Sequence, residues 1–353
     1  MNRVADRFSR VLKPLAEEVI AVIAGLLVGA LFITVCGYDP IEAYIAMFQG
    51  AFGGVHQLAE TLAAAIPILL TGLTFAICVK VGLFNIGAEG QAYIGAVAAV
   101  LIGAQSFPYG VHLLAAVFVA MLAGALWSIP PALLKISRGV HEVVSTIMLN
   151  WIAFYLVYYL ARGPLVDASR PEKTVSVSPT SRFPILIEGT TLTAVLFIGV
   201  LFAVALYIVL WHTPLGYEMR SLGLNPNASK FAGVSYNKAV LSAFVLGGFT
   251  AGLAGAVQIL GRSPTYALYG DLSNIVNIGF DGLAVAMIGR NHPLGMILSS
   301  IFFGGLYTGA RWMQILAGVP LELVRIIEGI IVIATAIPEI IYMIKRLGAR
   351  RIA

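Results

Sequence analysis

Apolar runs of about twenty residues recur along this chain, and they limit what it can fold into. Between Val19 and Met343 the sequence returns repeatedly to hydrophobic stretches that contain few charges. A helix needs about 20 predominantly apolar residues to cross the hydrocarbon core of a bilayer. Only 11% of the 353 residues are charged, whereas soluble domains carry about 25%. The sequence therefore predicts an all-α membrane protein that crosses the bilayer many times.

Ten stretches are long and apolar enough to be transmembrane spans. They are 17–37, 58–79, 84–104, 111–134, 142–161, 191–211, 239–260, 272–289, 294–311 and 321–343. Polar residues interrupt the start of the third span, and the eighth span is short and contains Asp281. We expect an N-terminal cytoplasmic segment at 1–16, a transmembrane domain over 17–343 and a cytoplasmic tail at 344–353.

The distribution of basic residues predicts how the spans are oriented. Lys and Arg cluster near both chain ends, for example at Arg3 and Arg351, and they recur in every second predicted loop. Because basic residues are retained on the cytoplasmic side, an even number of spans with both termini inside fits this pattern. The predicted outer loop 38–57 has no basic residue, whereas the outer loop 162–190 mixes both signs and fits least well. The net charge of +5 is thus attributed to basic residues that flank membrane spans on the cytoplasmic side. No nucleic-acid partner is expected.

The longest predicted inner loop, 212–238, contains the signals of a short helix. Asn225 can cap a helix, Pro226 suits its first position and Gly233 can end it. We therefore expect a helix over 226–232. Two interpretations of it are open: an ordinary amphipathic loop, or a docking helix that receives force from a cytoplasmic partner.

Two similar polar clusters interrupt the apolar sequence far apart. Residues 84–90 read FNIGAEG and residues 276–282 read VNIGFDG. Five predicted spans separate the clusters, so the second has the opposite orientation, and spans 2–5 and 7–10 would be inverted repeats. In a membrane, carboxylates and broken helices are tolerated where they pack inside the protein or line a wet cavity. Both interpretations are open for the four polar residues of the clusters, which are Asn85, Glu89, Asn277 and Asp281.

The fifth predicted span carries a polar stripe. Glu142, Thr146 and Asn150 are spaced i, i+4 and i+8, which places them on one face of a helix. Glu142 lies near the predicted helix start, where the helix dipole favours an acid. We expect Thr146 to hydrogen-bond a neighbouring helix and Asn150 to contact a substrate path. Trp151 and the other tryptophans are interpreted as interfacial or packing residues.

Several motifs that would indicate chemistry are absent from the sequence. It has no G-x-x-x-x-G-K-[ST] loop, no H-E-x-x-H and no G-x-S-x-G. Its five histidines show no spacing typical of metal ligands. No catalytic residue, metal or cofactor is therefore predicted.

Three stretches resemble a known family. They are GLTFAICVKVGLFNIGAEGQAYIGAVAA (72–99), HEVVSTIMLNWIA (141–153) and GYEMRSLGLNPNASKFAGVSYNKAV (216–240). They resemble permease subunits of bacterial ABC importers, in the family for branched-chain amino acids, ribose and related sugars, and nucleosides. The forms GLFNIGAEGQ and EVVSTIMLN are similar to the branch paired with basic-membrane-lipoprotein receptors, which imports nucleosides. The resemblance extends over about residues 15–345.

The resemblance implies a type II importer fold in a bacterial cell membrane, without enzymatic activity of its own. The loop after span six would dock on a separate ABC ATPase subunit. Residues that match the family's loop pattern or its helix start are Gly216, Arg220, Gly223, Asn225, Pro226, Ala228 and Gly233. The other implied partners are a second permease of a different sequence and an extracellular substrate-binding lipoprotein.

Three functions compete at this point. The first is an ABC permease for nucleosides, and its close variant carries simple sugars such as ribose. The second is an ion-coupled secondary transporter, in which Glu89 and Asp281 would titrate or bind the coupling ion. A membrane enzyme or structural anchor is disfavoured because no catalytic set is present.

Overall fold

The computed structural model describes residues 2–334, which form two compact units. One unit combines Met1–Gln57 with Gly305–Ala353, and the other is Leu58–Gly304. We call them the terminal unit and the central unit. The end of the tenth predicted span and the predicted tail 344–353 lie outside the described residues.

The terminal unit is helical throughout most of its described length. It contains helix α1 (Asn2–Val35), helix α2 (Pro40–Phe52), the end of helix α12 (Pro293–Ala317) and a helical stretch over 321–334. Helix α1 begins at residue 2, so residues 2–16 of the predicted N-terminal segment are helical and continuous with the first span. Gly50 of α2 packs directly on α12, since a Cβ built there would lie 2.3 Å from Trp312.

Helix α2 corrects the prediction of a loop over 38–57. Asp39 caps this helix, because its Oδ1 accepts a hydrogen bond from the N–H of Ile41 at 2.7 Å. Pro40 occupies the first helical position, where its missing N–H costs nothing. The Tyr44 hydroxyl donates to the Leu26 carbonyl at 2.6 Å and ties α2 to α1.

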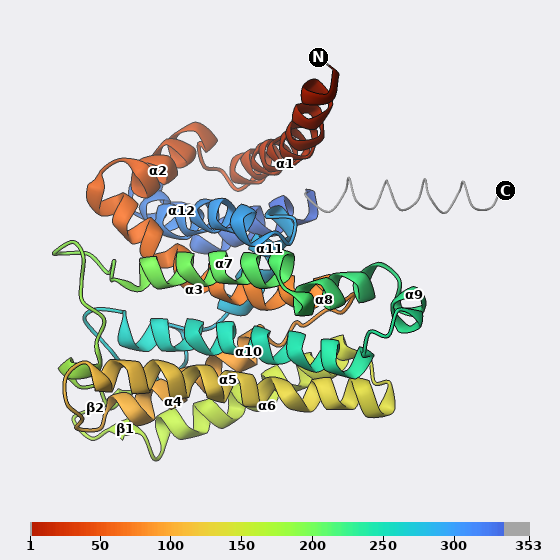
Figure 1. Cartoon of the computed structure of the whole chain (residues 1–353). Helices are drawn as coiled ribbons and strands as arrows, with labels where there is room; N and C mark the ends of the chain where they lie inside the picture. The colour runs from red at the N-terminus through yellow and green to blue at the C-terminus, as the bar shows by residue number, and fades with distance from the viewer. Residues whose placement is uncertain (1, 335–353) are drawn as a thin grey trace. The chain divides into compact units, whose positions relative to one another are not determined.

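The central unit holds most of the helices. They are α3 (Val55–Lys80, which begins in the terminal unit), α4 (Ala88–Gly103), α5 (Val111–Arg138), α6 (Glu142–Arg162), α7 (Val195–His212), α8 (Pro214–Leu224), α9 (Pro226–Phe231), α10 (Tyr236–Leu260), α11 (Ile278–Ile288) and the start of α12. Helices α5, α6, α7 and α10 run roughly side by side (Figure 1). Strands β1 and β2 lie at one end of these helices, and α8 and α9 lie at the other. We call these the hairpin end and the loop end.

Six helices of the described residues are long and apolar enough to cross a membrane. They are α3, α5, α6, α7, α10 and α12. Helix α11 has 11 residues, so it extends only about 16 Å, roughly half of the hydrocarbon core. The prediction of a full span over 272–289 is therefore wrong. The chain is irregular over 261–277, and α4 likewise starts only at Ala88, after the first polar cluster has broken the helix.

Helices α4, α5 and α10 pack with their backbones in direct contact, and we call them the tight core. A Cβ built on Gly252 of α10 would lie 2.3 Å from the Ala120 carbonyl oxygen of α5. At Gly255 of α10 it would lie 2.1 Å from the Ala92 carbonyl oxygen of α4. Small residues allow such close approach, which is how membrane helices gain packing energy without a hydrophobic driving force between them.

The predicted outer loop 162–190 is structured and includes the strands of the fold. Strands β1 (Val166–Asp167) and β2 (Arg170–Thr174) form an antiparallel hairpin, and a 3-10 helix, η1 (Pro179–Ser181), follows. The segment after α10 runs along this hairpin. The N–H of Thr174 donates to the Leu268 carbonyl at 2.8 Å, and the N–H of Gly270 donates to the Glu172 carbonyl at 2.8 Å. The six candidate spans are helical, as the all-α prediction requires. That prediction did not include the antiparallel hairpin of β1 and β2.

Candidate functional site

Helices α4 and α11 run to opposite ends of the central unit. Helix α4 ends at Gly103, whose carbonyl accepts a hydrogen bond from the N–H of Ser178, just beyond the hairpin, at 2.7 Å. Helix α11 is followed by His292, whose ring lies 4.7 Å from the ring of Trp211 near the loop end of α7. The N-termini of the two short helices therefore meet in the interior of the unit, where the two polar clusters are.

Glu89 joins the two clusters. Its Oε1 accepts hydrogen bonds from the N–H of Asn277 at 2.5 Å and from the Tyr93 hydroxyl at 2.6 Å. Its Oε2 accepts from the N–H of Gly279 at 2.5 Å. The first N–H groups of a helix have no partner within it, and their partial positive charge favours an anion. The buried Glu89 carboxylate thus caps α11 from the first turn of α4.

Asn150 of α6 supports the broken backbone before α4. Its Nδ2 donates to the Ile86 carbonyl at 2.8 Å, and its Oδ1 accepts from the N–H of Gly90 at 2.9 Å. Within the cluster, the Oδ1 of Asn85 accepts from the N–H of Gly87 at 2.9 Å. Broken helix at membrane depth needs such partners, because no bulk water is available to its N–H and C=O groups.

The second cluster is arranged differently from the first. Asn277 adopts φ +72°, in the left-handed region that Asn enters more readily than most residues. Asp281 lies in the first turn of α11 and is partly buried. Thr71 of α3 donates its hydroxyl to the Ile278 carbonyl at 2.7 Å, a contact that sequence reasoning missed. A polar residue inside the very apolar α3 is the signal that could have indicated it.

The predicted polar stripe on α6 is present, but one of its contacts differs from the prediction. Glu142, Thr146 and Asn150 are all buried. The Thr146 hydroxyl donates to the Glu142 carbonyl at 2.8 Å in its own helix rather than to a neighbouring helix. Thr commonly bonds the carbonyl four residues earlier, which sequence spacing does not distinguish from an outward contact. Glu142 pairs with Lys135 at 2.8 Å at the loop end.

A cavity of about 300 Å³ lies beside the junction of the two clusters. Its lining residues are Glu89, Tyr93, Ile147, Asn150, Trp151, Phe154, Val276, Asn277 and Phe280. Three of the six polar candidates for a substrate path, Glu89, Asn150 and Asn277, are thereby brought together. The other three candidates, Asn85, Thr146 and Asp281, are outside this lining set. Sequence reasoning missed the aromatic wall, although the repeated rings of α6 could have indicated it.

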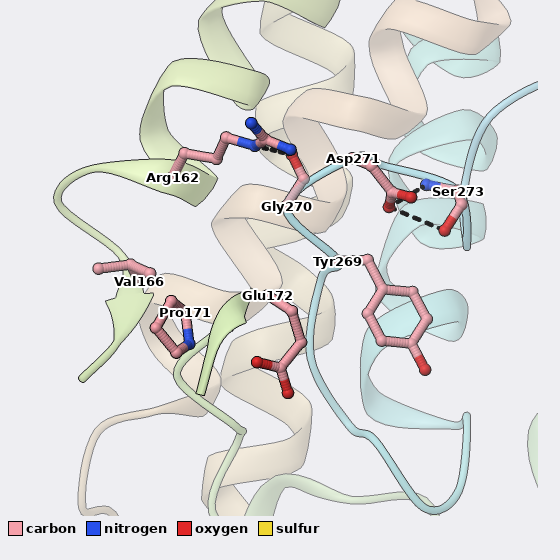
Figure 2. A pocket seen from close by; sticks show the side chains of 8 residues that line it. All are labelled: Arg162, Val166, Pro171, Glu172, Tyr269, Gly270, Asp271 and Ser273. Carbon is pink, nitrogen blue, oxygen red and sulfur yellow. Dashed lines mark hydrogen bonds between the residues drawn. The ribbon is translucent and has the colours of Figure 1, made fainter. Parts of the chain in front are cut away.

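A second pocket, of about 620 Å³, lies at the hairpin end (Figure 2). It is lined by Arg162, Val166, Pro171, Glu172, Tyr269, Gly270, Asp271 and Ser273. The Nε of Arg162 donates to the Gly270 carbonyl at 3.0 Å. Asp271 accepts from the N–H of Ser273 at 3.0 Å and from its hydroxyl at 2.8 Å, and these bonds hold the pKa of the Asp271 carboxyl below its usual value. Both signs of charge therefore surround this pocket at neutral pH.

At the loop end, the predicted short helix is present as α9. The Oδ1 of Asn225 accepts from the N–H of Ala228 at 3.1 Å, and Pro226 is the first helical residue. Gly233 follows the helix with φ +84°, the left-handed conformation that ends many helices. Helix α8, which precedes α9, was not predicted.

The remaining residues of the loop pattern fix α8 against its neighbours. A Cβ on Gly216 would lie 2.2 Å from the Val209 carbonyl oxygen of α7, and one on Gly223 would lie 2.3 Å from the Lys80 carbonyl oxygen of α3. The Nε of Arg220 donates to the carbonyl of Leu210 at 2.8 Å. A displacement of α8 must therefore be transmitted to the loop ends of α7 and α3.

Among residues 19–334, whose side chains the structure describes, no group of three or more His, Cys, Asp or Glu side chains is placed to hold a metal ion.

Comparison with known proteins places these features in a family context. Residues 57–336 match the family described as branched-chain amino acid transport system / permease component. The guanosine ABC transporter permease protein NupP of Bacillus subtilis is 38% identical over 335 residues, which cover 94% of each chain. The nucleoside ABC transporter permease protein NupB of Lactococcus lactis is 34% identical over 348 residues, covering 95% of this chain and 93% of NupB.

Another relative, named for a different solute, has a similar sequence identity. The glucose ABC transporter permease protein TsgB13 of Haloferax volcanii is 32% identical over 327 residues, covering 89% of this chain and 85% of its own. No solved structure matches the chain.

Proposed function

Because the chain belongs to the branched-chain amino acid transport system permease family and is the permease component of an ABC importer, we propose that it forms the membrane path for nucleosides. A permease of this class performs no catalysis, and the ATPase is a separate partner chain. The path would pass the junction of α4 and α11, where Glu89, Asn150 and Asn277 line the central cavity.

The composition of the central cavity is the observation that supports nucleosides most directly. A nucleoside combines a flat aromatic base with a polar ribose. The cavity offers aromatic rings for the base, including Trp151, Phe154 and Phe280, and the amide group of Asn277 for the ribose hydroxyls. Two relatives carry nucleoside names and one carries a glucose name, so sequence similarity alone does not decide the solute.

We assign the loop end of the central unit to the cytoplasm. Lys and Arg gather there, as expected for cytoplasmic flanks of membrane spans. These residues are Lys80, Lys135, Arg138 and Arg220. Helices α4 and α11 would then be corresponding half-helices of two inverted repeats, since they run in opposite directions from one junction. Both chain termini would be cytoplasmic.

Helix α9 is our candidate for the contact with the ATPase. Its last residue, Phe231, is 95% exposed, and Leu224, the last residue of α8, is 88% exposed. We take these two exposed apolar side chains as candidates for burial against the ATPase. Closure of the ATPases on ATP would push α9, and the packed contacts of Gly216 and Gly223 would carry that displacement into α7 and α3. A second permease of different sequence and an extracellular substrate-binding lipoprotein would complete the complex.

Uptake by the reconstituted complex tests this proposal. Vesicles that contain both permeases, the ATPase and the receptor should accumulate radiolabelled guanosine with ATP present, and not with a proton or sodium gradient alone. Accumulation of glucose or ribose instead of guanosine would replace the proposed solute. Gradient-driven guanosine uptake that requires no ATPase and is abolished by Glu89→Gln would indicate an ion-coupled carrier instead.

A further inference from the structure

Aromatic side chains follow one face of α6 in close succession. The rings of Trp151 and Tyr155 stack with centroids 6.1 Å apart, and those of Phe154 and Tyr158 stack at 6.2 Å. The rings of Phe154 and Tyr155 meet edge to face at 5.4 Å. Together with Tyr159 these residues are spaced i, i+3, i+4, i+7 and i+8, which places them along one side of the helix. We call these five residues the α6 ladder.

The α6 ladder connects the two pockets of the central unit. Trp151 and Phe154 belong to the wall of the central cavity. At the other end, Arg162 belongs to the wall of the hairpin-end pocket (Figure 2). The Arg162 guanidinium lies 4.6 Å from the ring centroid of Tyr158. A continuous series of π-faces therefore leads from the hairpin-end pocket to the central cavity.

An interfacial aromatic belt accounts for Tyr158 and Tyr159 near the end of α6, but not for Trp151 and Tyr155. Such belts lie at the two ends of a span, at the level of the lipid headgroups. Trp151 is the tenth of 21 residues in α6, which places it close to the middle of a helix about 31 Å long. Its side chain is nevertheless 57% exposed in this chain, and that of Tyr155 is 64% exposed.

The tyrosine hydroxyls also favour a wet surface. Within the described residues, the hydroxyls of Tyr155, Tyr158 and Tyr159 make no hydrogen bond. A hydroxyl that is transferred from water to hydrocarbon without a partner is destabilised. Tyr155 lies seven residues before the end of α6, so water in a transport path would hydrate its hydroxyl, whereas lipid chains would not.

We propose that the α6 ladder is a stacking track along which the base of a nucleoside moves from the hairpin-end pocket to the central cavity. This inference rests on the proposed nucleoside function. Aromatic side chains bind any base through its π-face, so they provide successive contacts without strong selectivity among bases. Arg162 can begin the track, because a guanidinium also stacks on a base. Sugars lack a flat aromatic base, so they would gain less from this track.

The direct test compares two substitutions of Trp151 in the complete reconstituted importer. Trp151→Leu keeps an apolar side chain and removes the ring, whereas Trp151→Phe keeps a ring. The loss of one base-stacking contact should lower kcat/KM for guanosine uptake roughly 5- to 150-fold in Trp151→Leu, and Trp151→Phe should recover most of it. Phe118→Leu is the matched control, since Phe118 lies on α5 outside the ladder and is 58% exposed. Its uptake should equal that of the wild type.

Two further measurements separate transport from assembly. The amount of second permease that co-purifies and the receptor-stimulated ATPase rate should remain unchanged in Trp151→Leu. Unchanged guanosine uptake in both Trp151→Leu and the triple variant Trp151→Leu, Tyr155→Leu, Tyr159→Leu would overturn the inference and assign this face to lipid. Loss of the second permease from the purified complex would also overturn it and assign the face to a protein interface. If the wild-type importer itself carried no nucleoside, the proposed function would fail before the track was tested.

Discussion

The two polar clusters share an Asn-Ile-Gly beginning and a carboxylate, but they are held in place by different contacts. The first cluster is supported from α6, where Asn150 bonds the backbone of both Ile86 and Gly90. The second cluster depends on the first, because Glu89 accepts the N–H groups of Asn277 and Gly279. Two similar sequence clusters thus correspond to a one-way dependence, in which the start of α11 needs α4.

This difference predicts unequal effects of matched substitutions, and the largest should follow from Glu89→Ala. Three donors, the N–H groups of Asn277 and Gly279 and the hydroxyl of Tyr93, would lose their acceptor in the protein interior. At about 1–3 kcal/mol for each unsatisfied buried group, the folded state should lose at least about 3 kcal/mol. A lower Tm of the purified permease complex would measure it.

Glu89→Gln is the control for Glu89→Ala. One side-chain oxygen remains able to accept a hydrogen bond, so the loss of Tm should be intermediate. If the Glu89→Ala variant had the Tm of the wild type but no transport activity, the carboxylate would act only in the transport path. The dependence of α11 on α4 would then be refuted.

A methyl group in the second cluster should be the next most damaging change. In Gly279→Ala the added Cβ would lie 2.4 Å from the backbone nitrogen of Glu89, and overpacking of this kind costs up to about 3 kcal/mol. In Gly87→Ala the nearest atom would be the Oδ1 of Asn85 at 2.9 Å, the end of a side chain that can move. Urea unfolding of the two variants should therefore separate them, and equal midpoints would contradict the contrast.

Removal of the support from α6 should have a somewhat smaller effect. Asn150→Ala leaves the Ile86 carbonyl and the Gly90 N–H without partners, at an expected cost of about 2 kcal/mol. Hydrogen exchange should accelerate at the amides of the first cluster more than at those of α11. Faster exchange at α11 alone would contradict the assignment of Asn150 as the support of the first cluster.

The smallest effect is expected at Asn277. Its left-handed φ suits glycine, so Asn277→Gly should change stability by less than about 1 kcal/mol, whereas Asn277→Val should cost about 1–2 kcal/mol. Asn277 also lines the central cavity. We therefore expect Asn277→Gly to alter the KM of guanosine uptake without altering the Tm, and a fall in Tm comparable with that of the valine variant would argue against this separation.

Sequence signals correctly predicted those helix boundaries that are set by contacts between residues close in the chain. Helix α6 begins at the predicted residue and ends within one residue of the predicted 161. The cap at Asn225, the first-turn Pro226 and the terminating Gly233 correctly located α9, because each acts on its own backbone. Hydropathy could not reveal that α11 covers only half a span, since an apolar irregular segment scores like an apolar helix.

The contacts of the candidate site required the fold. Glu89 and Gly279 are 190 positions apart, so their pairing follows from the packing of α4 against α11 and not from spacing along the chain. Sequence reasoning expected Asn150 on a path and left Glu89 and Asn277 open between packing and a path, and the structure brings the three residues to one cavity. It interpreted Trp151 as interfacial or packing, because exposure at mid-helix becomes visible only once the neighbouring helices are placed.

The glycine contacts of the tight core have a mechanical consequence. Where Gly252 and Gly255 seat the α10 backbone directly on α5 and α4, no layer of flexible side chains lies between the helices to absorb sliding. We therefore expect helices α4, α5 and α10 to move together as one rigid block. Helix α11 is joined closely to α4 and α3 as well, because a Cβ on Gly279 would lie 2.4 Å from the backbone nitrogen of Glu89 and one on Gly282 would lie 2.5 Å from that of Gly72. A displacement of α11 would therefore also be felt at the Glu89 carboxylate, which bonds its first turn.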